Sequence, residues 1–185
     1  MGLQIEDGRG SGQQVEVKNN KLLVSGVVSS PEHYANHAQG LGFNTVISAT
    51  PTGAGSYFFY LKNENTDSPL TIEGMWLKME ADDYIQIELN DTGIPIGGND
   101  IVPINANTSS GTKALGIFQE GPNITGLNSG DRFHKIYHAT SKASTYSNFN
   151  MDIVIGPNGI FTLSSGIGTV PIEVVLVMNY HGTDN

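Results

Sequence analysis

Two histidine pairs are the first side chains in this chain whose type and spacing could support chemistry. His33 and His37 are four residues apart, so on a helix they would share one face and could bind zinc. The HEXXH zinc motif requires a glutamate directly after the first histidine, and Tyr34 stands there instead. No third ligand lies nearby in the sequence. We therefore predict no metal site here and interpret both histidines as capping or loop-packing residues.

The second pair, His134 and His138, would lie on one face of a strand. A strand rises about 3.3 Å per residue, which places these side chains too far apart to share an ion. We expect solvated or edge histidines. Asp91, Asp100 and Asp131 lie near glycine-rich turns, but their spacing is not that of a calcium-binding EF-hand loop. We interpret these carboxylates as soluble turn residues.

The sequence also lacks the common catalytic motifs. It contains no GxSxG nucleophile elbow, no P-loop and no GxGxxG that opens a helix. Sequence alone cannot place two carboxylates across a cleft. We therefore assign no catalytic residue and no cofactor, and we predict that the protein is not an enzyme.

Charge and composition narrow the function classes further. The chain has 185 residues, a formal net charge of −9 and only 9 lysines and arginines. Nucleic-acid binding requires clustered cations, so this balance argues against it and against an anionic membrane surface. The absence of cysteine excludes a disulfide framework and fits assembly in a reducing cytoplasm. The N-terminus does not have the pattern of a signal peptide, and no apolar run approaches the roughly 18 residues that span a bilayer.

The elements that must position these residues are strands. Residues 55–89 predict three consecutive strands, which we interpret as a meander with one wet and one dry face. The apolar phase switches at Gly74, which predicts a β-bulge. We expect a hairpin with Asn19 and Asn20 at its turn and a short helix over residues 31–42. Further strands are predicted at residues 44–49, 101–104, 114–119, 132–140, 151–155, 160–163 and 172–180, with loops over residues 91–98, 120–131 and 141–150.

Together these patterns predict an all-β protein with one domain. Short strands joined by turns rich in glycine and asparagine favour an antiparallel β-sandwich, and the long loops favour the jelly-roll type. We place a flexible N-terminal arm at residues 1–12 because of its GRGSG run, and a single sandwich domain at residues 13–185.

Two strands are apolar on both faces, although one face of an antiparallel sandwich strand should be wet. The last strand carries Val175 and Val177 on its second face, and the first meander strand carries Phe58 and Tyr60. The N-terminal arm or hairpin could cover these side chains, or a neighbouring subunit could. We therefore take these four residues as the candidate subunit interface. Trp76, the only tryptophan, is interpreted as a core or interface residue rather than as a stacking platform.

Two segments carry a family resemblance: EDGRGSGQQVEVKNNKLLVSGVVSSPEHYANHAQGLGFNTV (residues 6–46) and SYFFYLKNENTDSPLTIEGMWL (residues 56–77). Their layout resembles structural proteins encoded in the morphogenesis regions of tailed bacteriophages. The resemblance covers about the first half of the chain, and its motifs do not specify a position in the virion. It implies a small jelly-roll subunit that decorates or cements a capsid shell, with no catalytic residues.

On this basis we expect a capsid decoration protein at the surface of the virion head, assembled in the host cytoplasm. Its partners would be further copies of itself, as a homotrimer, and the major capsid protein. Leu3, Ile5 and Arg9 are the candidate docking residues of the arm. The alternative is a tail or fibre module that binds a host-surface glycan through its loops.

Overall fold

The structure is a computed structural model that describes residues 17–18, 21–22, 40–139 and 145–180. The chain divides into two units, residues 1–30 and 31–185. In the first unit, β1 (Val17–Lys18) pairs with β2 (Lys21–Leu22) in antiparallel orientation, as predicted for the N-terminal hairpin. The predicted boundary at residue 12 stays a prediction, because residues 1–16 lie outside the described part.

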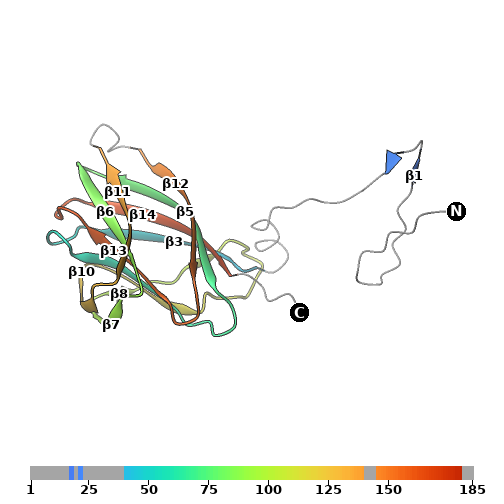
Figure 1. Cartoon of the computed structure of the whole chain (residues 1–185), viewed down its shortest axis with the longest axis horizontal. Coiled ribbons are helices and arrows are strands. Elements are labelled where there is room, and N and C mark those ends of the chain that lie inside the picture. The colour runs from blue at the N-terminus through green and yellow to red at the C-terminus, as the bar shows by residue number, and fades with distance from the viewer. Residues whose placement is uncertain (1–16, 19–20, 23–39, 140–144, 181–185) are drawn as a thin grey trace. The chain divides into compact units, whose positions relative to one another are not determined.

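The second unit is a sandwich of two antiparallel sheets (Figure 1), which confirms the predicted fold class. The seven-stranded sheet has the order β11-β6-β13-β4-β10-β7, with β8 paired to β10, and the five-stranded sheet has the order β12-β5-β14-β3-β9. The described residues contain no helix. The strands are β3 (Gly42–Ala49), β4 (Tyr57–Asn63), β5 (Leu70–Met79), β6 (Asp83–Leu89), β7 (Thr92–Ile96), β8 (Asn99–Asp100), β9 (Ile104–Asn105), β10 (Gly116–Asn128), β11 (Asp131–His138), β12 (Ser147–Ile155), β13 (Ile160–Ser165) and β14 (Ile172–Tyr180).

The core lies between the two sheets and follows the period of two in each strand. In β14, for example, alternate side chains from Ile172 to Met178 are buried. Aromatic pairs fill both ends of this core: Phe43 meets Tyr180 edge-on at 5.8 Å between ring centroids, and Phe59 meets Phe161 at 6.2 Å. The two layers are also joined by a hydrogen bond, because the Ser48 backbone N–H of β3 donates to the Glu120 carboxylate of β10 at 2.8 Å.

The predicted meander is wrong in its pairing, although its three strands form where the sequence placed them. β4 and β6 belong to the seven-stranded sheet with β13 between them, whereas β5 belongs to the five-stranded sheet. The chain therefore crosses between layers after β4 and again after β5. Local alternation identifies a strand, but the partner of β4 is β13, about 100 residues away in the sequence.

Several strand boundaries also differ from the prediction. β10 continues to Asn128 through a segment predicted as a loop, since its register shifts around Pro122 let the strand bend and pair with β7. β12 begins at Ser147, within another predicted loop. β7 forms inside the predicted turn over residues 91–98, and residues 101–103 are not a strand. Of the predicted helix, residues 31–39 lie outside the described part, and Gly42 already belongs to β3.

Two members of the candidate subunit interface require correction. Phe58 and Tyr60 are buried within the chain itself, at 0% and 2% exposure. β4 is a central strand between β13 and β10, and Phe58 contributes to the main core. These side chains therefore have no surface to offer a neighbouring subunit.

Candidate functional site

The outward face of the five-stranded sheet is the most distinctive exposed surface of the described chain. We call it the outer face. Val175 on β14 lies opposite Val46 on β3 and Trp76 on β5, so three apolar side chains form a row across three strands. Val46 and Trp76 are exposed, and Val175 and Val177 are half-buried. The predicted second apolar side of β14 is thus real, and Trp76 belongs to this face rather than to the core.

A hollow beside this row, which we call the Trp76 hollow, arises from the bulge predicted at Gly74. Gly74 pairs with Val177 and Ile72 with Met178, so Glu73 is an extra residue on β5. The pairing with β12 is interrupted at the same place, where Met151 and Asp152 of β12 lie opposite Glu73. Because Gly74 has no side chain, the surface next to Trp76 is left open. The hollow has a volume of about 290 Å³ and is lined by Phe43, Asn44, Glu73, Trp76, Ala106, Val177, Met178 and Asn179.

A polar pair stands in the wall of the Trp76 hollow. Asn179 is only 3% exposed, and its side-chain amide donates a hydrogen bond to the Glu73 carboxylate. The side-chain Oδ1 of Asn179 is buried and accepts no hydrogen bond from any residue that the structure describes. A buried acceptor without a donor is rare and costs free energy, so this atom is a marker for a missing partner.

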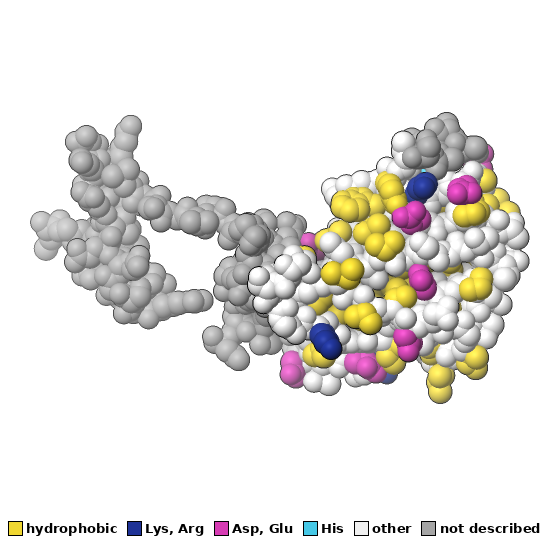
Figure 2. Space-filling view, turned by 180° about the vertical axis from the view of Figure 1, so that it is seen from behind, with side chains coloured by type: hydrophobic (Ala, Val, Ile, Leu, Met, Phe, Trp, Pro, Cys, Tyr) yellow, Lys and Arg dark blue, Asp and Glu magenta, His cyan; other side chains and the backbone are white. Residues whose placement is uncertain are grey.

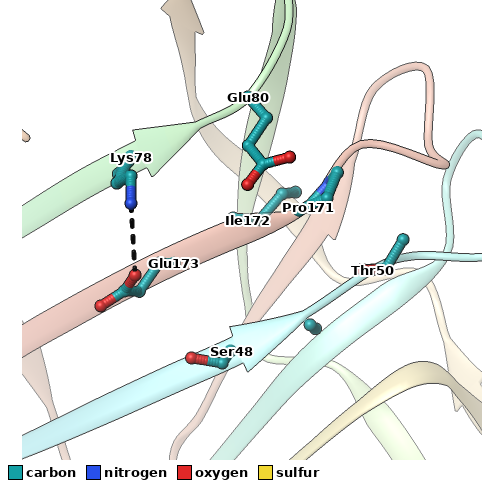
Figure 3. Close-up of a pocket in the computed structure, with 8 residues that line it drawn as sticks. Ser48, Thr50, Lys78, Glu80, Pro171, Ile172 and Glu173 are labelled. Atoms are coloured by element: carbon teal, nitrogen blue, oxygen red, sulfur yellow. Dashed lines mark ion pairs between the residues drawn. The ribbon is translucent and has the colours of Figure 1, made fainter. Parts of the chain in front are cut away.

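A second hollow lies at the opposite end of the same face, and we call it the Lys78 hollow (Figure 3). It has a volume of about 260 Å³, with Ser48 and Thr50 from β3 and the turn after it on one side. The Lys78 ammonium of β5 lies 3.9 Å from the Glu173 carboxylate of β14. The Tyr146 hydroxyl also donates to Glu173, and Lys78 lies 5.9 Å from the centre of the Tyr146 ring. These charges are partnered within the chain.

One face of the sandwich carries apolar groups with acidic side chains among them. On the face of the sandwich shown in Figure 2, hydrophobic side chains lie in groups and Asp and Glu are spread among them, whereas Lys and Arg are few. This distribution follows the formal net charge of −9.

Three carboxylates of β6 and the turn after it are buried: Asp83, Glu88 and Asp91. The sequence identified neither Glu88 nor Asp91 as buried. Glu88 accepts hydrogen bonds from the Tyr57 hydroxyl at 2.7 Å, from the Gln86 amide, and from the Gly130 backbone at 3.2 Å. Asp91 accepts a hydrogen bond from the Thr162 hydroxyl. The expectation that Asp91 is a soluble turn residue is wrong, because it is 2% exposed.

Burial raises the pKa values of Asp91 and Tyr57. Loss of solvent raises the pKa of Asp91; the hydrogen bond from Thr162 opposes this effect, and the charge of Glu88 adds to it. Burial also raises the pKa of Tyr57, as does its hydrogen bond to Glu88. The carboxylates are held by neighbours and closed to solvent, which fits a structural role better than proton transfer to a substrate.

The remaining predicted residues divide by position. His134 and His138 both lie on the edge strand β11, as expected of edge histidines. His134 is exposed, but His138 is buried and is not solvated, and neither of its ring nitrogens has a hydrogen-bond partner among the described residues. Asp100 and Asp131 are exposed turn or strand-end residues, as expected. The candidate metal ligands His33 and His37 and the candidate arm residues Leu3, Ile5 and Arg9 lie outside the described residues.

Among the residues that the structure describes, no group of three or more His, Asp or Glu side chains could hold a metal ion. The same part of the chain contains no helix long and apolar enough to cross a membrane.

Fold and surface together define an antiparallel two-sheet β-sandwich with an open outer face. Comparison with protein-family models, with curated proteins and with solved structures gave no match.

Proposed function

We propose that this chain is a non-enzymatic structural protein of a tailed-bacteriophage virion, a capsid decoration protein that assembles as a trimer on the head shell. The resemblance of residues 6–46 and 56–77 to phage morphogenesis proteins is the reason for the virion context. The two-sheet sandwich is compatible with such a subunit. Glu88 and Asp91 are buried and have almost no access to solvent, which supports a role without catalysis.

A jelly-roll fold is part of this proposal, and strand order supports it. The strands alternate between the sheets from β3 to β6 and again from β11 to β14, and β6 and β11 are neighbours in one sheet. β3, β5, β12 and β14 belong to one sheet, and β4, β6, β11 and β13 to the other. Two four-stranded sheets with this alternation are what a double Greek key requires. β7 to β10 then form an insertion between β6 and β11.

The observation that carries the assembly proposal is a run of exposed aliphatic side chains over residues 94–104, which we call the apolar segment. Ile94 is 77% exposed, Val102 79% and Ile104 71%, with Ile96 also exposed. Four such residues within one short segment form the kind of apolar surface that marks a protein contact. The segment follows one side of the sandwich, from the edge strand β7 to β9 in the other sheet.

Charge favours a second copy as the occupant of the apolar segment. Copies of a chain with a formal net charge of −9 repel each other wherever acidic surfaces meet. Residues 92–105 contain a single charged side chain, Asp100, so copies can approach there at low electrostatic cost. Pro95 has no N–H and makes β7 a poor edge for strand addition, so side chains rather than backbone would form the contact.

Sedimentation velocity over a range of concentrations tests this assembly. We expect a trimer for the wild type and a monomer for the double variant Ile94→Ser, Val102→Ser. Both side chains are exposed in the chain, so the far-UV circular dichroism of the variant should stay native. Ile167→Ser, which alters another exposed aliphatic residue, after β13, is the control and should remain trimeric. A wild type that is monomeric at every concentration, or a double variant that stays trimeric, contradicts the proposal.

Attachment to the shell is proposed to use the arm, residues 1–12, with Leu3 and Ile5 as apolar contacts and Arg9 as the cation. Ordering a dozen residues costs more than about 10 kcal/mol of conformational free energy, which two apolar side chains cannot offset alone. Three arms presented by one trimer gain avidity, by a factor of about 100 or more. A chain without residues 1–12 should therefore trimerise normally but fail to bind emptied capsids in a co-sedimentation assay.

A further inference from the structure

We propose that the Trp76 hollow binds one pyranose ring of a neutral carbohydrate. The hollow is formed by β3, β5 and β14 and by Ala106, directly after β9. Its volume of about 290 Å³ is close to that of the smallest ligand pockets, which is about 300 Å³. That space suits one sugar ring better than a drug-sized ligand. The proposal goes beyond assembly and holds for a position on the head or on the tail.

The polar wall of the hollow has an unused hydrogen-bonding group. Asn179 donates a hydrogen bond from its amide to Glu73, and its buried Oδ1 has no donor among the described residues. A sugar hydroxyl can donate to this oxygen once the Asn179–Glu73 pair adjusts, and the Glu73 carboxylate can accept from a neighbouring hydroxyl. Asn44, exposed on the adjacent strand β3, adds a side-chain amide at the rim. Vicinal hydroxyls of a pyranose match this set of closely spaced donors and acceptors.

The apolar wall matches the other side of a sugar ring. The Trp76 indole is 42% exposed, and Val177 stands next to it in the hollow. Gly74 lies opposite Val177 and has no side chain. The space beside Trp76 and Val177 is therefore not filled at this position of β5. A pyranose combines an apolar C–H face with a polar rim, and an exposed indole offers the apolar body and polar edge that such a ligand requires.

Charge selects among carbohydrates. Glu73 lies in the wall of the hollow, and the chain as a whole is acidic. An anionic sugar such as a sialic acid would bring a second carboxylate close to Glu73, and like charges disfavour binding. Neutral hexoses and their N-acetylated forms avoid this repulsion. We therefore expect neutral pyranosides to bind in preference to acidic ones.

The fluorescence of Trp76 gives a direct test, because it is the only tryptophan in the chain. The full-length protein is titrated with the methyl glycosides of glucose, galactose, mannose and N-acetylglucosamine, and with N-acetylneuraminic acid. We expect a saturable change in Trp76 emission with at least one neutral glycoside at millimolar concentration and at least tenfold weaker binding of the acidic sugar. No saturable change with any of the four neutral glycosides overturns the proposal, as does preferential binding of the acidic sugar.

Variants then locate the binding site by isothermal titration calorimetry with the best glycoside. Trp76→Ala and Glu73→Gln should each weaken binding by at least tenfold, while their melting temperatures show that the fold is kept. Phe133→Ala removes another exposed aromatic side chain, from β11, and should leave binding unchanged. Unchanged affinity in both Trp76→Ala and Glu73→Gln, or an equal loss in Phe133→Ala, overturns the assignment. The trimer assay with Ile94→Ser, Val102→Ser is independent of these results, so the two proposals can fail separately.

Discussion

Trp76 and Val175 lie directly opposite each other in the pairing of β5 with β14, and neither side chain points into the core. Val174, one residue earlier on β14, lies opposite Leu77 and is fully buried between the sheets. Two adjacent valines of one strand therefore have opposite environments, which is the property that creates both the core and the outer face.

This relationship predicts that a threonine substitution destabilises the fold at Val174 and has little effect at Val175. Val174→Thr buries a hydroxyl among apolar side chains and should lower the free energy of unfolding by about 1–3 kcal/mol. Val175→Thr changes the outer face and should stay within about 0.5 kcal/mol of the wild type. Urea unfolding measures both. Equal losses would show that the outer face is not open in solution.

Gly130 predicts a second contrast. A Cβ atom at this position would collide with the Leu89 carbonyl oxygen and would lie 2.8 Å from the backbone nitrogen of Asp91. The Gly130 N–H also donates to Glu88, so a shift of the backbone would disturb the buried carboxylates. Gly130→Ala should therefore lower the free energy of unfolding by about 1–3 kcal/mol.

Gly156→Ala is the matched control for Gly130→Ala, because a Cβ atom there meets nothing within 4 Å. Its stability in the same urea titration should equal that of the wild type within about 0.5 kcal/mol. If Gly130→Ala unfolds at the same urea concentration as Gly156→Ala, the loop does not pack on Asp91 as described.

The raised pKa of Asp91 predicts how stability depends on pH. The folded chain holds a proton at Asp91 that the unfolded chain releases above a pH of about 4. Stability contributed by this group is therefore present below that pH and is lost as the pH rises through the pKa of Asp91 in the fold. Asp91→Asn cannot titrate, so it should show a smaller loss of stability between pH 4 and pH 8.

Urea unfolding at several pH values, with Asp152→Asn as an exposed control, measures this difference. The Asp152→Asn variant should follow the wild-type pH profile. A profile for Asp91→Asn that parallels the wild type would mean that Asp91 has an ordinary pKa and is solvated.

Local patterns predicted most of the strands but, apart from the N-terminal hairpin, none of the pairing. The alternation in residues 57–62 and 84–89 is a property of each strand by itself, and the bulge at Gly74 follows from a change of phase within β5. Which sheet receives each strand depends on contacts between distant segments, such as β13 with β4. The three strands of the predicted meander were therefore placed correctly in the sequence, but their pairing was wrong.

Burial on the second face could not be predicted for the same reason. Glu88 alternates with apolar residues and looks solvent-facing in the sequence. Its carboxylate accepts hydrogen bonds from Tyr57 of β4 and from Gly130 in the turn between β10 and β11. Phe58 and Tyr60 look unpartnered in the sequence but are covered in the fold. Of the Trp76 hollow, only the bulge at Gly74 had a sequence signal, because Glu73 and Asn179 lie 106 positions apart.

Cryo-electron microscopy of the virions that contain this protein tests the central proposal most directly. We expect a trimer of β-sandwiches on the outer surface of the head shell. Residues 94–104 should lie at the contacts between copies, and the outer face of the five-stranded sheet should be open to solvent. Density for the sandwich on the tail alone, or particles without this protein on the head, would contradict it.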